Sequence, residues 1–255
     1  MATRVELERV RVVLVGARNP NNIGAAARAM QDFGFKDLRL VNEYRVPLDG
    51  ARAAVGAAEL LASAVECASV AEAVAECSLV VGTTAVGERE IAHRLVGLVE
   101  GAREILGELK GVSGSTPRVA LLFGSEKTGL TTEQLSHCDW LLTIPMAEVE
   151  DARHLSMNLG QAVAVCLYEL VRAEGLVAAS EAQAATAGEV ERVTKALREV
   201  MEATEYTRRF PANCDESDVR QLVKRMRLSA KDATAWMGIL RQMMWKVRGG
   251  RDNLQ

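Results

Sequence analysis

The sequence predicts an α/β fold built on a parallel sheet, followed by a small all-α domain. Two observations predict the sheet: short runs rich in Val, Leu and Ile, and helical stretches that alternate with them along the chain. A third observation predicts the all-α part, because the apolar residues beyond residue 188 recur at helical spacing. The runs are largely apolar, interrupted only by Arg11, Arg39 and Thr143, as strands are when both faces of a sheet are covered. The expected strands are residues 10–15, 38–41, 79–81, 119–123 and 141–144.

The expected helices of the α/β part lie between and after these strands. Residues 22–33 and 88–109 are expected to be helical, and an Ala-rich segment over 51–75 is expected to form a broken helix. Residues 156–172 predict a further helix, which is apolar or small nearly all round. A helix of that kind is buried on more than one side. We therefore expect it to pack both on the sheet and on a second copy of the chain.

The chain divides into an α/β domain of residues 1–175, a linker of residues 176–188 and a helical domain of residues 189–255. The linker region is rich in Ala, Ser, Gly, Gln and Thr and has no sustained apolar stripe. Three helices are expected beyond it. We interpret the Met and Trp side chains of these helices as core rather than as a platform for stacking. In the last helix the apolar stripe consists of Trp236, Leu240, Met243 and Val247.

Composition excludes several classes of protein. The 255 residues are 49% hydrophobic and 25% charged, which excludes general disorder and allows a sizeable core. Apolar stretches are too short to span a bilayer, and a charged amino terminus excludes a secretory signal, so we expect a cytoplasmic protein without a membrane segment. The five cysteines lie far apart without CxxC spacing, which predicts reduced thiols.

The net charge of -3 hides an asymmetry along the chain. Residues 189–255 carry 14 Lys+Arg against 10 Asp+Glu, whereas residues 1–188 carry 17 against 24. Solvated helix faces explain so small a surplus as well as a functional surface does. The alternative is a basic helical domain that contacts a polyanion while the larger domain carries out chemistry.

Three familiar kinds of site are disfavoured. The histidines, His93, His137 and His154, have no partner at metal-ligand spacing, so no metal is expected. The 124–129 loop has the GxxxxG spacing of a phosphate loop, but Leu130 stands where that loop needs a lysine. The turn at 16–24 lacks the GxGxxG spacing of a dinucleotide site.

Polar clusters follow three of the predicted strands, where open α/β sheets collect ligands. They lie at 21–28, 123–130 and 144–159. Taken singly, each has a simpler explanation: a capped Ala-rich helix with a surface arginine, a turn with a solvated glutamate, and a helix capped by Ser156. Their order and spacing form recognisable motifs: NxGxxxR at Asn22, Gly24 and Arg28, FGSExxGL at 123–130, and IPM followed by SxN at Ser156 and Asn158.

These motifs resemble those of the SpoU or TrmH family of the SPOUT class, RNA ribose 2'-O-methyltransferases, and most closely its TrmJ-like tRNA methyltransferases. The resemblance covers about residues 9–172. It implies that the carboxyl-terminal part of the sheet is threaded into a trefoil knot, an exception to the rule that chains do not knot. It also implies a homodimer that binds S-adenosylmethionine.

The resemblance also assigns candidate site residues. Arg28 is the residue expected to matter most, by clamping a substrate phosphate and stabilising the nascent alkoxide, because a guanidinium stays protonated and is a poor base. Asn22 and Glu126 would orient it, with Ser156 beside the reacting hydroxyl. The implied catalytic set is Arg28, Asn22, Glu126, Ser156 and Asn158. The implied cofactor-binding set is Thr83, Thr84, Ala85, Gly124, Ile144, Leu155, Ser156 and Met157.

The expected activity is methyl transfer to a ribose 2'-hydroxyl of tRNA, at cytidine or uridine in the anticodon loop. The helical domain fits an accessory RNA-binding role through its basic residues, which can meet phosphates without reading bases. Ribosomal RNA remains open as a substrate. The alternatives are a knotted RNA-binding or assembly factor that lacks the reaction, and a phosphate-loop nucleotide hydrolase. The basic residues expected to meet RNA are Arg208, Arg209, Arg220, Lys224, Arg225, Arg227, Arg241, Lys246 and Arg248.

Overall fold

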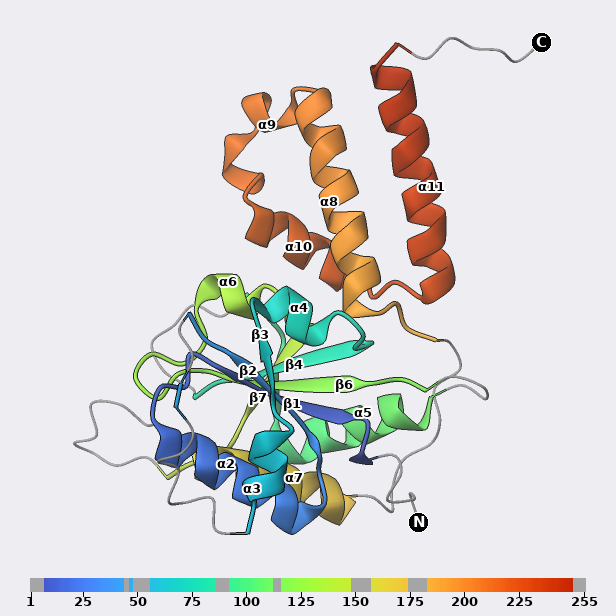
Figure 1. The fold of residues 1–255 in the computed structure, drawn as a ribbon. Helices are drawn as coiled ribbons and strands as arrows, with labels where there is room; N and C mark the ends of the chain where they lie inside the picture. The colour runs from blue at the N-terminus through green and yellow to red at the C-terminus, as the bar shows by residue number, and fades with distance from the viewer. Residues whose placement is uncertain are drawn as a thin grey trace.

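A parallel sheet with helices on both faces forms the first part of the chain, and a helical tail, residues 183–249, stands over one of those faces (Figure 1). The computed structural model describes residues 7–43, 46–47, 56–85, 92–111, 116–147, 157–173 and 183–249. Within these ranges, no helix is both long and apolar enough to cross a membrane.

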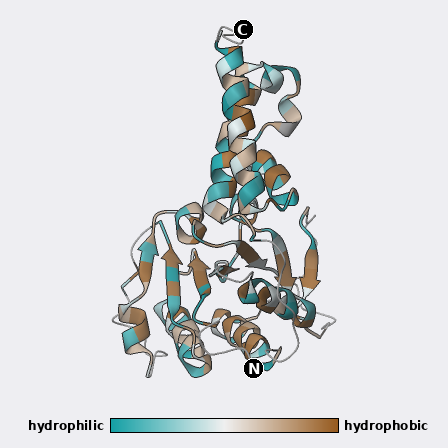
Figure 2. Cartoon of the chain, turned by 90° about the vertical axis from the view of Figure 1, so that its right-hand side faces the viewer, coloured by the Kyte–Doolittle hydropathy of each residue, from teal (hydrophilic) through white to brown (hydrophobic). Residues whose placement is uncertain are grey.

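The sheet has seven strands in the order β3-β2-β1-β6-β4-β7-β5, and all of its pairings are parallel. The five predicted apolar runs are confirmed as β1, β2, β4, β6 and β7. Figure 2 shows how hydrophobic residues concentrate in these strands. The strands are β1 (Val10–Val15), β2 (Asp37–Val41), β3 (Val65–Cys67), β4 (Leu79–Thr83), β5 (Leu95–Gly97), β6 (Val119–Phe123) and β7 (Trp140–Thr143).

Two strands were not predicted, and both lie at the edges of the sheet. β3 and β5 have three residues each, and most of those residues are exposed, so neither produces an apolar run. The helix expected over 88–109 is therefore wrong over residues 92–97, and residues 88–91 lie outside the described residues. Residues 95–97 form β5, and the helix α5 (Leu98–Lys110) begins only after Gly97, its N-cap.

Helices cover the two faces of the sheet unequally. The long helices α2 (Pro20–Phe33), α5 and α7 (Leu159–Ala173) share one face, and their apolar side chains form one core cluster with Val12, Leu14 and Trp140. Val13 and Val15 point to the opposite face, as strand geometry requires. That face is covered by the short helices α4 (Val70–Val74) and α6 (Thr132–Leu135) and by the tail (Figure 1). The short helix α3 (Ala58–Ala62) lies beside α2, and its Leu60 and Leu61 pack against the core cluster of the long helices.

The helical tail contains the three expected helices and encloses its own apolar cluster. Its helix α11 departs from expectation: Leu240 is buried and Trp236 is half-buried, but Met243 and Val247 are 47% and 45% exposed and are not core. Residues 176–182 of the expected linker lie outside the described residues. The tail consists of α8 (Ala187–Ala203), α9 (Tyr206–Arg209), the 3-10 helix η2 (Pro211–Asn213), α10 (Glu216–Arg225) and α11 (Ala230–Val247).

The cysteines are free, as expected. Burial raises the pKa of Cys77 to about 11 and the pKa of Cys138 to about 12. Because thiolates are the reactive form, these two thiols are inert packing groups near neutral pH.

Backbone and side-chain contacts join the tail to the sheet layer. The N–H of Gly188 donates to the carbonyl of Ala75 at 2.7 Å, where an added Cβ would meet that same oxygen at 2.7 Å. Beside this contact, Lys224 pairs with Asp139 at 3.2 Å. Asp139 also accepts the N–H of Val80 at 2.8 Å, so the ion pair reaches β4, an interior strand of the sheet.

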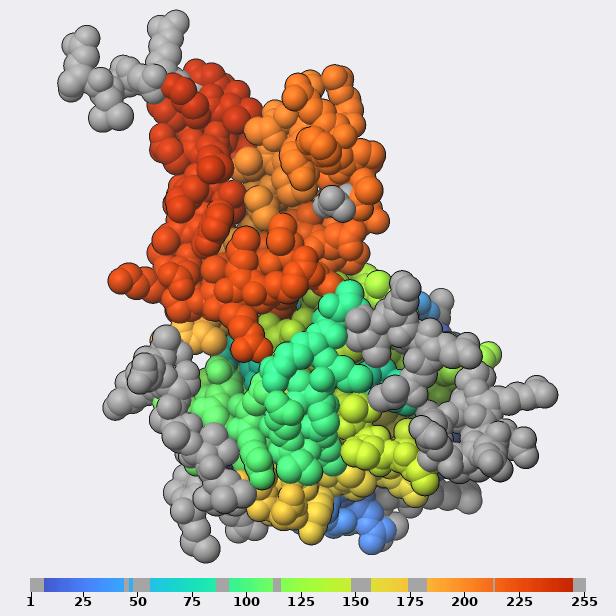
Figure 3. Space-filling model, turned by 180° about the vertical axis from the view of Figure 1, so that it is seen from behind, coloured from blue at the N-terminus to red at the C-terminus, as the bar shows by residue number. Residues whose placement is uncertain are grey.

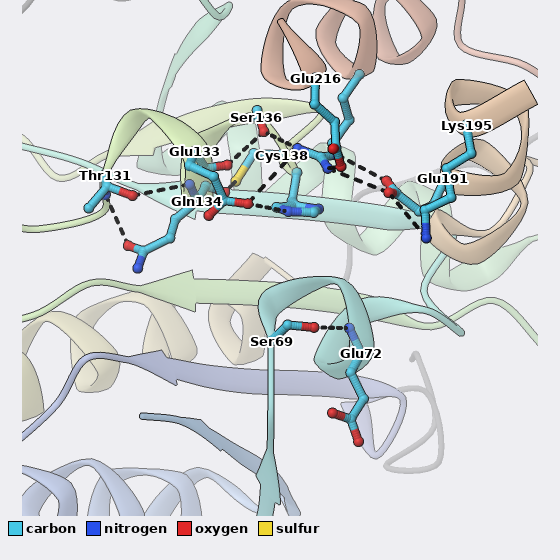
Figure 4. Close-up of polar contacts among 12 residues, drawn as sticks. Ser69, Glu72, Thr131, Glu133, Gln134, Ser136, Cys138, Glu191, Lys195 and Glu216 are labelled. Atoms are coloured by element: carbon cyan, nitrogen blue, oxygen red, sulfur yellow. Dashed lines mark hydrogen bonds and ion pairs between the residues drawn. The ribbon is translucent and has the colours of Figure 1, made fainter. Parts of the chain in front are cut away.

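Arg220 is the centre of the junction. It is only 4% exposed and donates to the Ser136 hydroxyl after α6 at 2.8 Å, to Glu191 of α8 at 2.9 Å and to Glu216 at 2.6 Å. Figure 4 shows Glu191 and Glu216 of the tail facing the Ser136 segment. The expectation that Arg220 and Lys224 meet RNA phosphates is therefore wrong, since both are buried in ion pairs within the chain.

Two titratable groups at the junction have shifted pKa values. Burial opposes ionisation of Glu191, but the hydrogen bond from Arg220 and the nearby positive charges together outweigh it and hold the pKa of Glu191 below its ordinary value. Burial and the charge of Arg220 lower the pKa of His137, although the hydrogen bond with Glu133 acts in the opposite direction. The junction is therefore built for an ionised glutamate and a neutral histidine.

We expect Arg220→Met to destabilise the protein by about 3 kcal/mol, because Glu191 and the Ser136 hydroxyl would lose their hydrogen-bond donor while remaining in the junction. The measurement is the free energy of unfolding in urea. The control is Arg209→Met, which removes an exposed arginine of the tail and should change that free energy by less than about 0.5 kcal/mol. Equal effects of the two substitutions would show that the junction contributes nothing.

The free energy of unfolding should also fall as the pH decreases from about 7 to 5.5. The unfolded chain takes up the His137 proton near pH 6.5 and the folded chain only at lower pH, so protonation favours unfolding. His93, whose pKa burial also lowers, adds to this slope. The slope should be shallower in His137→Gln, and an unchanged slope would remove His137 from the account.

Candidate active site

The first predicted cluster begins at the start of α2, directly after β1. Asn19 is the N-cap, since its Oδ1 accepts the N–H of Asn21 at 3.0 Å, and Pro20 follows it as the first helical residue. Asn22 therefore lies inside the first turn of α2. Its side chain is not used as a cap and reaches two other segments of the chain.

A chain of hydrogen bonds joins the three predicted motifs. The Nδ2 group of Asn22 donates to Glu126 Oε1 at 2.9 Å, and Asn158 Nδ2 donates to Asn22 Oδ1 at 3.1 Å. An ionised carboxylate only accepts, so Asn22 must turn its amide nitrogen to Glu126, which leaves its oxygen for Asn158. Residues separated by more than one hundred positions thus form one polar cluster, Glu126–Asn22–Asn158.

Asn158 is itself held by the helix it precedes. Its Oδ1 accepts the N–H groups of Gly160 and Gln161, at 3.0 and 3.4 Å, so Asn158 caps α7. Gly160 allows this helix to approach α2, because an added Cβ there would lie 2.5 Å from the Cβ of Ala25. Gly160 was not among the predicted site residues, although a glycine inside an apolar helix is a signal for close packing.

Glu126 is presented by a tight loop after β6. An added Cβ at Gly124 would lie 2.1 Å from the carbonyl carbon of Gly129, so this position admits only glycine. The N–H of Gly129 donates to Ser125 O at 2.9 Å, and Gly129 has a φ of 69°. The loop folds back on itself and leaves Glu126 exposed at its tip.

The segments expected to bind the cofactor follow three neighbouring strands, β6, β4 and β7. Thr83 donates its hydroxyl to Leu122 O at 2.9 Å, and the N–H of Thr84 donates to Leu142 O at 3.0 Å, which ties these strand ends together. Gly124 follows β6 directly. The side chains at this edge remain partly accessible: Thr83, Thr84, Ile144 and Met157 are half-buried and Ala85 is exposed.

Arg28 is not brought to the Glu126–Asn22–Asn158 cluster within one chain. Both Asn22 and Arg28 lie in α2, and six helical residues separate them by about 9 Å along the axis and place them on different sides of the helix. Because Asn22 is already helical, no loop geometry at Asn22 brings its side chain next to Arg28. Arg28 is exposed, and it has no ion pair or hydrogen bond with the described part of the chain.

Two expected site residues, Leu155 and Ser156, lie outside the described residues. No group of three or more His, Cys, Asp or Glu side chains within the described ranges could hold a metal ion.

A parallel α/β sheet that gathers polar side chains at neighbouring strand ends defines a ligand-binding protein of the open-sheet class. Comparison with known proteins then gives the family. Residues 9–168 match the model of the SpoU rRNA Methylase family, and the chain belongs to this family.

Curated relatives carry more specific names. The chain is 35% identical, over 64% of its length, to tRNA (cytidine/uridine/adenosine-2'-O-)-methyltransferase TrmJ of Pseudomonas aeruginosa, of which it spans 61%. It is 32% identical to tRNA (cytidine/uridine-2'-O-)-methyltransferase TrmJ of Sodalis glossinidius, covering 92% of this chain and 91% of that protein. The crystal structure of TrmJ from Z. mobilis matches with a TM-score of 0.75 and 28% identity, covering 92% and 98% of the two chains.

Substitutions at Asn158 can separate the effect of its hydrogen bond to Asn22 from the effect of its cap on α7. Asn158→Asp keeps an oxygen to cap α7 but loses the donor to Asn22, whereas Asn158→Ala loses both. We expect the alanine variant to lose about 1 kcal/mol or more of unfolding free energy, because a helix cap is worth about that much. The aspartate variant should retain most of it. Equal losses in chemical denaturation would contradict a capping role.

Proposed function

We propose that this protein transfers the methyl group of S-adenosylmethionine to a ribose 2'-hydroxyl of tRNA, in the cytoplasm, at a cytidine or uridine of the anticodon loop. One observation carries the proposal: the Glu126–Asn22–Asn158 cluster unites the three motifs on which the family resemblance rests. Relatives that match nearly the whole chain, from Sodalis glossinidius and Klebsiella pneumoniae, are named tRNA (cytidine/uridine-2'-O-)-methyltransferases.

The strand ends beside this cluster suit S-adenosylmethionine. Ile144 and Met157 offer half-buried apolar side chains for an adenine ring, and the turns at Thr84 and Gly124 offer backbone polar groups. Leu155 and Ser156 complete the set on the family resemblance. When bound, the cofactor supplies an electrophilic methyl group on a sulfonium. The order of β6, β4 and β7, with β4 between two strands that follow it in sequence, agrees with the trefoil knot proposed for this region.

The task of the protein side chains is to make a ribose hydroxyl reactive. A neutral hydroxyl is a weak nucleophile until its proton leaves or its developing charge is stabilised. Arg28 holds the adjacent phosphate and stabilises the alkoxide by charge. Asn22 and Glu126 orient the reacting groups, and Ser156 lies beside the hydroxyl.

Arg28 performs this role in a homodimer. Its exposed position and its distance along α2 from Asn22 support a site that is completed by the second subunit. The exposed ring of Tyr168 on α7, 52% accessible and edge-on to Phe33 of α2, offers apolar surface on the same helix pair for that contact.

The helical tail contributes to RNA binding through its exposed arginines and lysines. Arg220 and Lys224 are buried in ion pairs, so the remaining exposed cations of the tail are the ones available to bind phosphates, without reading bases. They are Arg208, Arg209, Arg225, Arg227, Arg241, Lys246 and Arg248.

The direct test is incubation with labelled S-adenosylmethionine and unmodified tRNA, followed by mass mapping of the product. We expect one methyl group on a ribose in the anticodon loop, and turnover reduced about 10²- to 10³-fold in Arg28→Ala. Methyl groups found only on ribosomal RNA would show that the substrate is ribosomal RNA rather than tRNA. Absence of any ribose methyl would favour a non-catalytic RNA-binding factor.

A mixing experiment tests the shared site. Arg28→Ala and Asn158→Ala are each expected to be nearly inactive. Denaturing and refolding an equal mixture should restore about a quarter of the wild-type activity, because half of the dimers are mixed and one of their two sites is intact. If Arg28 serves the site of its own chain, the mixture stays as inactive as its components.

A further inference from the structure

The helical tail contains a groove that the proposed reaction does not use. It lies between α8 and α11 and has a volume of about 510 Å³. None of its lining residues belongs to the Glu126–Asn22–Asn158 cluster. Figure 3 shows the outer end of α11 standing beside the other tail helices, away from the sheet layer. Ala196 of α8 and Met244 of α11 form part of its apolar wall.

Trp245 gives the groove an aromatic face. Its side chain is 45% exposed, whereas Trp140 is fully buried and Trp236 is half-buried in the tail core. An indole left accessible beside an apolar wall forfeits part of its burial free energy unless something packs on it. Nucleobases stack on such rings irrespective of their identity.

Two cations stand on the same side of α11 as Trp245. Arg241, Trp245 and Arg248 follow the i, i+4, i+7 spacing of one helix face, and all three line the groove. Arg241 and Arg248 are exposed, and neither forms an ion pair with the described residues. They lie about 10 Å apart along the helix axis, so they can meet phosphates on either side of a single nucleotide.

Glu199 is the one acidic side chain among the described residues that line the groove. A carboxylate repels phosphate but accepts hydrogen bonds from exocyclic amino groups, as it does from the N4 group of cytosine. Glu199 lies on α8, whereas Arg241 and Arg248 lie on the α11 side of the groove. The α8 side therefore suits a base, and the α11 side suits phosphates. The occupant that matches both sides carries a negative backbone and a base with an amino group.

We propose that this groove binds one unpaired nucleotide of the RNA substrate, with an amino-bearing base stacked on Trp245 and its flanking phosphates at Arg241 and Arg248. The inference rests on the proposed function, which supplies RNA as the partner. Charge complementarity selects RNA over a second copy of the chain. Among the described residues the groove has two arginines without ion pairs and one acid, and residues 189–255 carry a surplus of cations.

The first test measures binding of unmodified tRNA and of short oligo(C) and oligo(U) by the full chain. Trp245→Leu keeps an apolar side chain but removes the stacking face, and it should weaken binding of tRNA and oligo(C) about 5- to 100-fold. Turnover at saturating tRNA should stay unchanged. Phe210→Leu is the matched control, an aromatic 53% exposed in the same tail but outside the groove, and it should bind as the wild type does.

Two further variants test the two sides separately. The double variant Arg241→Ala, Arg248→Ala should reduce the salt dependence of oligonucleotide binding by about one to two released counterions. Glu199→Gln should narrow the preference for oligo(C) over oligo(U), which we expect to be about tenfold in the wild type.

The outcomes separate this inference from the proposed function. Wild-type binding by Trp245→Leu, with normal methyl transfer, overturns the groove alone. Groove-dependent oligonucleotide binding without any methyl transfer leaves the groove standing and removes the proposed reaction. If Trp245→Leu instead changes the oligomeric state and leaves RNA binding intact, the groove is a contact between copies of this chain and the inference is wrong.

Discussion

The close approach of α2 and α7 is the constraint on which the candidate site depends. Gly160 and Ala25 let the beginnings of the two helices touch, which brings Asn158 to Asn22. A larger side chain at Gly160 would separate them, and the hydrogen-bond chain to Glu126 would lose its middle link. Helix packing, rather than the charges of the site, therefore determines whether three distant motifs act together.

Cations of the helical tail divide into two groups with different tasks. Arg220 and Lys224 are buried and neutralise carboxylates between the tail and the sheet layer, where their removal leaves unpaired charge. Arg241 of α11 and Arg248, its C-cap, are exposed and form no ion pair with the described residues. The tail is thus fixed to the sheet layer by one set of charges and presents another to solvent. An RNA bound by the second set would be held at a defined position relative to the strand ends.

Sequence patterns predicted the parts of the fold that depend on burial alone. β1, β4, β6 and β7 bury most of their residues and β2 buries alternate ones, so all five appear as runs rich in Val, Leu and Ile. β3 and β5 lie at edges and have three residues each, which leaves no pattern to detect. The motif residues Asn22, Glu126 and Asn158 were predicted because the order and spacing of their motifs resemble those of the family. The separation of Arg28 from them, and the burial of Arg220, depend on which helix face meets which neighbour, and a list of basic residues does not contain that information.

The coupling between Asn22 and Asn158 tests the central claim most directly. It is measured by a double-mutant cycle of Asn22→Ala and Asn158→Ala, read as kcat/KM for methyl transfer to tRNA under conditions where all variants are folded. The account predicts that the two losses are not additive, with a coupling free energy of at least about 0.5 kcal/mol. Losses that add to within about 0.3 kcal/mol would show that the two amides act independently and that no shared site joins the motifs.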